Sequence, residues 1–387
     1  MRSQSACESL PLLIARDWPT RAAGPMKEQR TPAEQREHMR PGSSTSFRQS
    51  PLLSNTSATQ KPTNMSAPKI VYGTAGFAPD AETGEVTSVV ETLNLLWDLG
   101  VKNLDTAQLY GPSEATIGKA HNPRRFTIDT KHAAGFKPAT ATTEGIVEHG
   151  TWASETLGPI DIYYLHAPEE NIPWETQLEG LQKLHDAGVF KRLGLSNFTP
   201  EQIQKIYDVA EAKGLIKPSV FQGNYNAFAR SQENNTFPLL RKLGMSFYAY
   251  SPVAGGLLAK TKEQLLSAGG RWQAGTLLGD MYRGMYGKDE LLDALADWET
   301  AAKKEGVSLA ELGYRWIQYH SALDGAKGDA VIFGAFSPEK IRETVSWLNK
   351  GPLSDQAVKE IDAIWEKIKD VAPVDNYNSY SKHKSAA

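Results

Sequence analysis

The sequence contains one cysteine, Cys7, among 387 residues. A single cysteine excludes an intrachain disulfide and a zinc site built from several cysteines, and it leaves no cysteine nucleophile after residue 7. This usage fits a reducing compartment, so we expect a cytoplasmic protein. No run of eighteen or more apolar residues occurs, and the apolar stretch at 10–15 is too short for a membrane span or a signal-peptide core.

The chain also lacks an excess of charge of one sign. It has 42 Lys and Arg against 45 Asp and Glu, a formal net charge of −3, and a mean hydropathy of −0.43. These values are typical of a soluble chain, and they favour neither a nucleic-acid partner nor a membrane partner. No His-rich cluster is apparent, so we expect no metal site.

Residues 1–66 have the composition of a disordered N-terminal extension. They are rich in Ser, Thr, Gln, Pro and Arg and show no sustained helical or strand period, so we assign one domain to residues 67–387. A mitochondrial transit peptide is the alternative, but five acidic residues weaken it: Glu8, Asp17, Glu28, Glu34 and Glu37. Met65 precedes the first strand-like run, so translation from there would yield the complete domain.

From residue 69 onward, short apolar runs alternate with longer amphipathic segments. Eight runs read as strands: 69–76, 103–107, 126–132, 160–166, 192–197, 219–226, 246–252 and 329–335. Helical spacing of apolar residues marks the segments 84–99, 142–157, 174–187, 200–213 and 308–322. Repeated strand and helix units predict an α/β fold, a (β/α)8 TIM barrel followed by a C-terminal helix and tail. A doubly wound sheet is the alternative, but "GTAGFAPD" after the first run is not G-x-G-x-x-G.

Four chemically active side chains follow three consecutive predicted strands. Asp105 and Tyr110 come after the second, Lys131 ends the third, and His166 ends the fourth. Each alone is more often structural than catalytic. In a barrel, however, catalytic groups project from the C-terminal ends of the strands, so we expect these four to meet there.

The chemistry of these side chains is complementary. A phenol with a pKa of about 10 is a poor acid near neutrality unless a cation stabilises its anion, and Lys131 is placed to do this for Tyr110. Asp105 would keep Lys131 charged, and His166 could orient a carbonyl oxygen or relay a proton. No activated nucleophile is evident, because "GLSNF" is not G-x-S-x-G. The set is suited to proton delivery to a carbonyl oxygen, which requires a hydride from a cofactor.

Six motifs together resemble the aldo-keto reductase superfamily over residues 69 to about 375: "LDTAQLYG", "IDTKH", "YYLHAPE", "LGLSNF", "FQGNYN" and "YSPVAGGLL". The segments "GNYN", "GDMYRGMYGKDELLDAL" and "PVDNYNSY" are most similar to the aflatoxin-aldehyde and succinic-semialdehyde reductase branch. The resemblance implies NADPH-dependent reduction of aldehydes or ketones to alcohols, with Asp105, Tyr110, Lys131 and His166 as the catalytic tetrad and Tyr110 as general acid.

The resemblance also implies the contacts of the cofactor's nicotinamide end. Ser196, Asn197 and Gln222 would hold the carboxamide, Tyr250 would stack on the ring, and Ser251 with the following loop would contact the pyrophosphate.

The adenosine end is implied by the match around "GAFSPEKIRET", which gives Gly334, Ser337 and Lys340 as further contacts. Lys340 stands where a polar or basic residue meets the 2′-phosphate, and a cation there favours NADPH. The alternative is a solvated lysine at a helix start. Phe336 and Thr344 depart from the family pattern.

Two other functions remain open. A regulatory subunit resembling the potassium-channel β-subunits would share the fold and most motifs, and a degenerate barrel would bind nucleotide without turnover. The intact tetrad weakens the degenerate barrel, and the branch-specific segments weaken the channel partner. The expected partner is a small-molecule carbonyl substrate, and the expected assembly, where there is one, is a homodimer.

Overall fold

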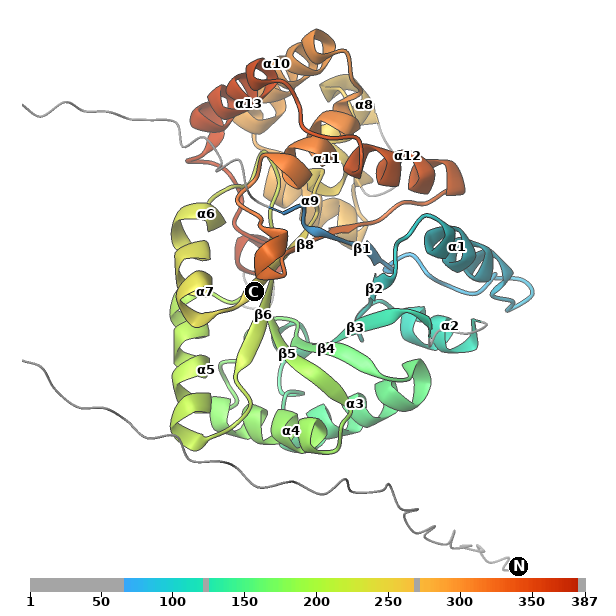
Figure 1. Ribbon diagram of the computed structural model, residues 1–387, viewed down its shortest axis with the longest axis vertical. Coiled ribbons are helices and arrows are strands. Elements are labelled where there is room, and N and C mark those ends of the chain that lie inside the picture. The colour runs from blue at the N-terminus through green and yellow to red at the C-terminus, as the bar shows by residue number, and fades with distance from the viewer. Residues whose placement is uncertain (1–65, 121–124, 268–271, 382–387) are drawn as a thin grey trace, which may run out of the picture. The chain divides into compact units, whose positions relative to one another are not determined.

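Eight parallel strands close into a barrel in the order in which they occur along the chain (Figure 1). The strands are β1 (Lys69–Gly73), β2 (Asn103–Asp105), β3 (Thr127–His132), β4 (Ile160–Leu165), β5 (Phe190–Ser196), β6 (Pro218–Asn224), β7 (Ser246–Tyr250) and β8 (Ala330–Phe333). Each strand-like run identified in the sequence overlaps one of them, although β5 and β6 begin before the predicted runs 192–197 and 219–226. The predicted (β/α)8 barrel is therefore confirmed.

The computed structural model describes residues 66–120, 125–267 and 272–381. These residues belong to the second of the two units into which the chain divides, which begins at residue 59. The prediction of a disordered extension falls, except for Ser66, outside the described residues. It remains a prediction, as does the assignment of 67–387 to one domain.

Closure of the barrel depends on the pairing of the first and last strands. β1 and β8 run parallel in a register that extends from Lys69 opposite Ala330 to Tyr72 opposite Phe333. No strand of this sheet keeps a free edge, because β8 pairs with β7 on its other side. All eight carboxyl ends consequently open onto one face of the barrel.

Helices surround the barrel and cover its strands (Figure 1). They are α1 (Thr87–Asp98), α2 (Ser113–Lys119), α3 (Thr143–Leu157), α4 (Trp174–Asp186), α5 (Pro200–Lys213), α6 (Gln232–Asn235), α7 (Phe237–Leu243), α8 (Lys262–Ser267), α9 (Leu277–Tyr286), α10 (Asp289–Glu305), α11 (Leu309–Tyr319), α12 (Pro338–Leu348) and α13 (Asp355–Ile368). All five helical segments read from the sequence contain a helix. The region between β7 and β8 holds four helices, α8 to α11, where a minimal barrel needs one.

Local sequence signals explain where the helices begin and end, as α5 illustrates. The Thr199 hydroxyl accepts from the backbone N–H of Gln202, and the Gln202 side chain accepts from the N–H of Thr199, which is a complete capping box. Pro200 occupies the first helical position, and Gly214 ends the helix in the left-handed region at φ 65°. The capped α5 then returns the chain to β6.

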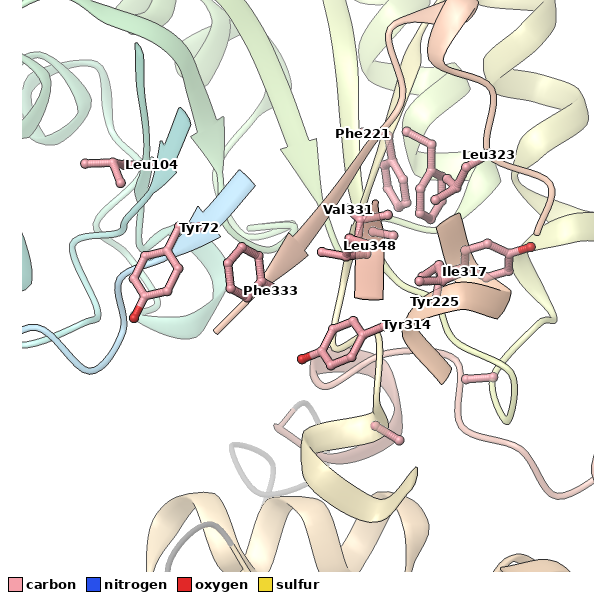
Figure 2. Close-up of a cluster of buried hydrophobic side chains, with 14 of the residues drawn as sticks. Tyr72, Leu104, Phe221, Tyr225, Tyr314, Ile317, Leu323, Val331, Phe333 and Leu348 are labelled. Carbon is pink, nitrogen blue, oxygen red and sulfur yellow. The ribbon is translucent and has the colours of Figure 1, made fainter. Parts of the chain in front are cut away.

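Alternation along each strand divides the apolar side chains between two layers. One layer fills the inside of the barrel: Val71, Ile162, Tyr164, Val220, Tyr248, Ala330 and Ile332. The other layer lies between strands and helices, and Figure 2 shows part of it around Tyr72 and Phe333, whose rings meet edge to face at 5.2 Å. Within the described residues, no helix is both long and apolar enough to cross a membrane.

The barrel interior is packed so closely that one strand position requires glycine for space. A Cβ at Gly194 of β5 would lie 2.2 Å from Cδ1 of the buried Tyr164 ring. We expect Gly194→Ala to lower the free energy of unfolding by about 1–3 kcal/mol, the usual cost of overpacking a core. Urea denaturation would measure the change.

Gly73→Ala in β1 is the matched control, because its added Cβ would meet the Ile332 side chain only at 3.3 Å. Equal losses of stability in the two variants would contradict the proposed clash with Tyr164.

Candidate active site

The four side chains expected to act together do meet at the carboxyl end of the barrel. Asp105 is the last residue of β2, Lys131 lies in β3, His166 follows β4, and Tyr110 lies in the loop before α2. The Lys131 Nζ is 2.6 Å from Asp105 Oδ2 and 5.1 Å from the centre of the Tyr110 ring. The rings of Tyr110 and His166 are edge to face at 5.8 Å.

Lys131 and Asp105 form an ion pair that is sealed from solvent, with 0% and 3% of their side chains exposed. Lys131 also donates to the backbone oxygen of Thr106 at 2.7 Å, and Asp105 Oδ1 accepts from Gln222 Nε2 at 2.8 Å. Burial alone would lower the pKa of Lys131, but the charge of Asp105 and its hydrogen bond hold that pKa above its ordinary value. The lysine therefore stays charged.

Tyr110 keeps its proton at neutral pH. Burial raises the pKa of Tyr110, while the neighbouring charge of Lys131 lowers it, and burial is the larger effect. Lys131 does lower the pKa of Tyr110, as expected, but its effect is only one of several. The net pKa of Tyr110 lies above the ordinary value, because burial and the charge of Asp105 together outweigh Lys131.

His166 is neutral. Burial, assisted by the charge of Lys131, lowers its pKa well below the ordinary value. Its Nδ1 is buried and has no hydrogen-bond partner among the described residues. A neutral imidazole carries one N–H, and this group can donate to a substrate oxygen.

Buried hydroxyl groups fix the loop that carries Tyr110. The Ser113 hydroxyl, at the start of α2, lies 3.0 Å from the Thr74 hydroxyl and 2.9 Å from that of Thr106. It also donates to the backbone oxygen of Thr74 at 2.9 Å. These contacts join the end of β1 to the loop. The helix α2 has only seven residues within the 21 positions that separate Tyr110 from Lys131.

A second polar network lies outside the barrel, behind β3. His149 of α3 contacts Glu114 Oε2 at 3.2 Å and the Tyr163 hydroxyl at 2.7 Å, and Thr130 donates to the other Glu114 oxygen at 2.5 Å. These groups come from α2, α3, β3 and β4, so they lock two helices onto the strands that carry the site. Sequence reasoning missed the network, since no spacing between residues 114, 130, 149 and 163 signals it.

Asp129 is another buried carboxyl group that sequence reasoning missed. It lies two residues before Lys131 on β3, so both side chains face the barrel interior, and this alternation could have revealed it. Its Oδ1 accepts from the N–H of Ile162 at 3.2 Å, and Oδ2 has no partner among the described residues. Burial, reinforced by Asp105, raises the pKa of Asp129 well above its ordinary value, which favours its protonated form.

The residues expected at the nicotinamide end are connected to the tetrad. Gln222 of β6 binds Asp105, and Asn197, just after Ser196 at the end of β5, donates to the backbone oxygen of His166 at 2.9 Å. The Tyr250 hydroxyl, at the end of β7, donates to Asn197 Oδ1 at 2.8 Å. Direct hydrogen bonds thus join β6 to β2, and the end of β5 to the ends of β4 and β7.

The loop after β7 has an unusual backbone. Ser251, Ala254, Gly255 and Gly256 all have positive φ, from 52° to 100°. A Cβ at Gly255 would lie 2.1 Å from the Tyr282 ring, so only glycine fits there. Left-handed residues within a turn direct neighbouring N–H groups to one side, a geometry that binds anions.

A cavity of about 1070 Å³ lies beyond this loop and includes three residues expected at the adenosine end: Gly334, Ser337 and Lys340. The Lys340 Nζ is 2.8 Å from Glu343, and its side chain is 65% exposed. Phe336, a departure from the family pattern, also lines the cavity and is 75% exposed. Among the described residues, no group of three or more His, Cys, Asp and Glu side chains could hold a metal ion.

The model of the aldo/keto reductase family matches residues 69–366, most of the barrel. The chain belongs to the aldo/keto reductase family. The family expected from the sequence is thereby confirmed. Membership of this family supports an enzyme that reduces carbonyl groups.

Characterised relatives support the same branch of the aldo/keto reductases. The oxidoreductase sirO of Leptosphaeria maculans is 35% identical over 79% of this chain and 96% of its own length. Aflatoxin B1 aldehyde reductase member 2 of Rattus norvegicus is 30% identical over 75% and 83%. The human aldo-keto reductase family 7 member A3 is 32% identical over 71% and 87%. The resemblance to the aflatoxin-aldehyde reductase branch is therefore confirmed.

His132, the neighbour of Lys131 on β3, makes the stability of this reductase depend on pH. Burial, with the nearby His149, lowers the pKa of His132 from 6.5 to about 3. Below pH 6.5 the unfolded chain binds a proton at His132 that the folded chain does not bind. The free energy of unfolding is therefore unaffected by His132 above pH 6.5 and falls as the pH drops toward 3. At pH 5 the loss is about 2 kcal/mol.

We expect His132→Asn to reduce by that amount the difference in unfolding free energy between pH 8 and pH 5, because asparagine does not titrate. Its side-chain oxygen can still accept from the N–H of Ala134, as His132 Nδ1 does at 3.1 Å. Urea denaturation at both pH values would test this, with His185→Asn, at a half-buried histidine of α4, as control. An unchanged pH dependence in His132→Asn would contradict the assignment.

Proposed function

We propose that the protein reduces aldehydes or ketones to alcohols with NADPH and that Tyr110 is the general acid. The observation that carries this proposal is the buried pair of Lys131 and Asp105 beside the Tyr110 ring. A solvent-free ammonium group held next to a protonated phenol is suited to stabilise the phenolate left after proton donation.

The residues around the barrel mouth fit NADPH. Ser196, Asn197 and Gln222 offer hydroxyl and amide groups for a carboxamide, and Tyr250 offers a ring for stacking. The left-handed turn that begins at Ser251 offers N–H groups to a pyrophosphate.

The cavity beyond the turn at Ser251 has the size and charge for a nucleotide. Its walls include Gly334, Ser337 and three lysines, Lys260, Lys303 and Lys340, against two glutamates, Glu299 and Glu343. When bound, NADPH supplies the hydride of the reaction.

The protein's own groups then perform the proton transfer. Tyr110 donates its hydroxyl proton to the carbonyl oxygen as negative charge develops there. Lys131 stabilises the phenolate, and Asp105 keeps Lys131 charged and fixed in place. His166, as a neutral imidazole, donates a hydrogen bond from a ring N–H that orients the same carbonyl oxygen.

The proposed partners and compartment are those expected from the sequence. We propose a small-molecule carbonyl compound as the partner, no nucleic acid and no membrane, and a reducing, cytoplasmic compartment in keeping with the single Cys7. The homodimer remains a prediction, which sedimentation velocity would test.

Tyr110→Phe is the direct test of the mechanism, because it removes only the hydroxyl group. We expect kcat for a small aldehyde such as a nitrobenzaldehyde to fall by about 10²–10⁴, the usual loss for a general acid, with an almost unchanged Kd for NADPH. Lys131→Met should be comparably severe. Asp105→Asn should retain more activity but shift the pH profile.

The rates would be followed by NADPH absorbance and the Kd by fluorescence titration. Near wild-type turnover in Tyr110→Phe would refute the mechanism. A wild-type protein that reduces no aldehyde or ketone would favour the regulatory subunit instead.

Lys340 tests the choice of cofactor. We expect Lys340→Ala to weaken NADPH binding by up to about tenfold and leave NADH binding unchanged, because only NADPH carries the 2′-phosphate. Glu343→Gln should tighten NADPH binding, since it removes the carboxylate that pairs with Lys340 at 2.8 Å. Both effects should shrink at high salt.

Lys359→Ala, on the exposed surface of α13, is the matched control for the lost charge. An unchanged ratio of NADPH to NADH affinity in Lys340→Ala would leave Lys340 as a solvated residue at the start of α12.

A further inference from the structure

The C-terminal segment, Val374–Ser381, touches residues expected at the nicotinamide end. The Asn378 Nδ2 donates to the backbone oxygen of Asn197 at 3.0 Å. The N–H of Asn376 donates to the Tyr250 hydroxyl at 3.2 Å, and Asn376 Oδ1 lies 3.1 Å from the same hydroxyl. A segment that follows the last helix, α13, therefore binds the ends of β5 and β7.

The same segment also reaches the loops that follow β3 and β4. The Tyr377 ring meets the Phe136 ring edge to face at 5.1 Å, and Phe136 meets the His166 ring at 5.1 Å. The Tyr377 hydroxyl donates to the backbone oxygen of Pro168 at 3.3 Å. The C-terminal segment thus contacts both the nicotinamide side and the side on which His166 lies.

Asp375 determines the local shape of the segment. It is buried, and its Oδ1 accepts from the backbone N–H groups of Tyr377 and Asn378 at 3.0 and 2.6 Å. Its Oδ2 accepts from Asn378 Nδ2 at 2.8 Å. One amide group of Asn378 is therefore shared between Asp375 and Asn197, and its two hydrogens account for both bonds.

Asn197 is the residue that needs this support. It has a φ of 63°, a left-handed conformation that costs an ordinary side chain about 1 kcal/mol or more. Its side-chain amide is engaged with the His166 backbone oxygen and the Ser196 hydroxyl, and its Oδ1 accepts from Tyr250. Asn378 adds the bond to its main-chain oxygen. The left-handed turn is thus held from several directions at once.

We propose that the C-terminal segment is a positioning element for the cofactor, in which Asp375 and Asn378 hold Asn197, and Asn376 holds Tyr250, in the geometry that receives the nicotinamide end. None of the three touches the reacting atoms. The inference rests on the proposed function, because it assumes that the nicotinamide lies between the ends of β5 and β7.

Asn378→Ala tests the proposal by removing the link to Asn197. We expect its Kd for NADPH, measured by fluorescence titration, to rise about tenfold, with a much smaller change in kcat at saturating NADPH. Asp375→Ala should weaken NADPH binding more, because it also frees the turn. Asn94→Ala, which removes an exposed hydrogen bond to Arg125 on the outer surface, is the matched control and should leave the Kd unchanged.

Hydrogen exchange in the wild type is a second measurement that needs no variant. We expect NADP⁺ to slow exchange of the amides in residues 374–381. Slowed exchange together with a raised Kd in Asn378→Ala supports the positioning role. An unchanged Kd in a folded Asn378→Ala, or exchange in 374–381 that NADP⁺ does not slow, would overturn it.

Tighter NADPH binding by Asn378→Ala would also overturn the proposal, since it would make the segment an obstacle to the cofactor. A wild-type protein that binds no NADPH would refute the proposed function together with this inference. Normal wild-type binding with unaffected variants would refute the inference alone.

Discussion

The buried ion pair of Lys131 and Asp105 is the interaction on which the candidate site depends. Removing two charges from water costs several kcal/mol for each ion, and their attraction offsets this only when geometry and further hydrogen bonds are good. The barrel supplies both, since Thr106 accepts from Lys131 and Gln222 donates to Asp105. Loss of either partner would leave an uncompensated buried charge, so the pair constrains the ends of β2, β3 and β6 together.

The barrel and the meeting of the four side chains could be predicted from the sequence because both follow from the order of strands and helices along the chain. Strand runs and capped helices recur along the chain, and parallel strands bring Asp105, Lys131 and His166 to one face whatever the details of packing. The contacts of the C-terminal segment could not be read in this way. Asn378 and Asn197 are 181 positions apart, and no periodicity connects them. The pairing of Lys340 with Glu343 depends on rotamers, which spacing alone does not determine.

Backbone strain is concentrated where the candidate site requires an unusual direction of the chain. The described residues other than glycine with positive φ are Ala134, Ala139, Asn197, Ser251 and Ala254, and all five lie in the connections that follow strands β3, β5 and β7. Such conformations persist only where surrounding contacts over-determine them. Asn197 shows how, because its neighbours on β4 and β7 and the C-terminal segment each supply a hydrogen bond.

The two oxygens of Asp105 connect the two halves of the proposed chemistry. Oδ2 accepts from Lys131, on the side from which Tyr110 would give its proton, and Oδ1 accepts from Gln222, on the side expected to hold the nicotinamide. A shift of Gln222 would therefore change the hydrogen bonding of the carboxylate that keeps Lys131 charged. Asp129 lies opposite Asp105 in the register of β2 and β3 and has a raised pKa, so Asp105, whose Oδ2 is 2.6 Å from Lys131 Nζ, is the carboxylate that balances the charge of Lys131. The carboxylate of Asp105 thus holds Lys131, the cation beside the proton donor, at a fixed position relative to Gln222, an expected cofactor contact. It can do so because β2 is short and ends at Asp105.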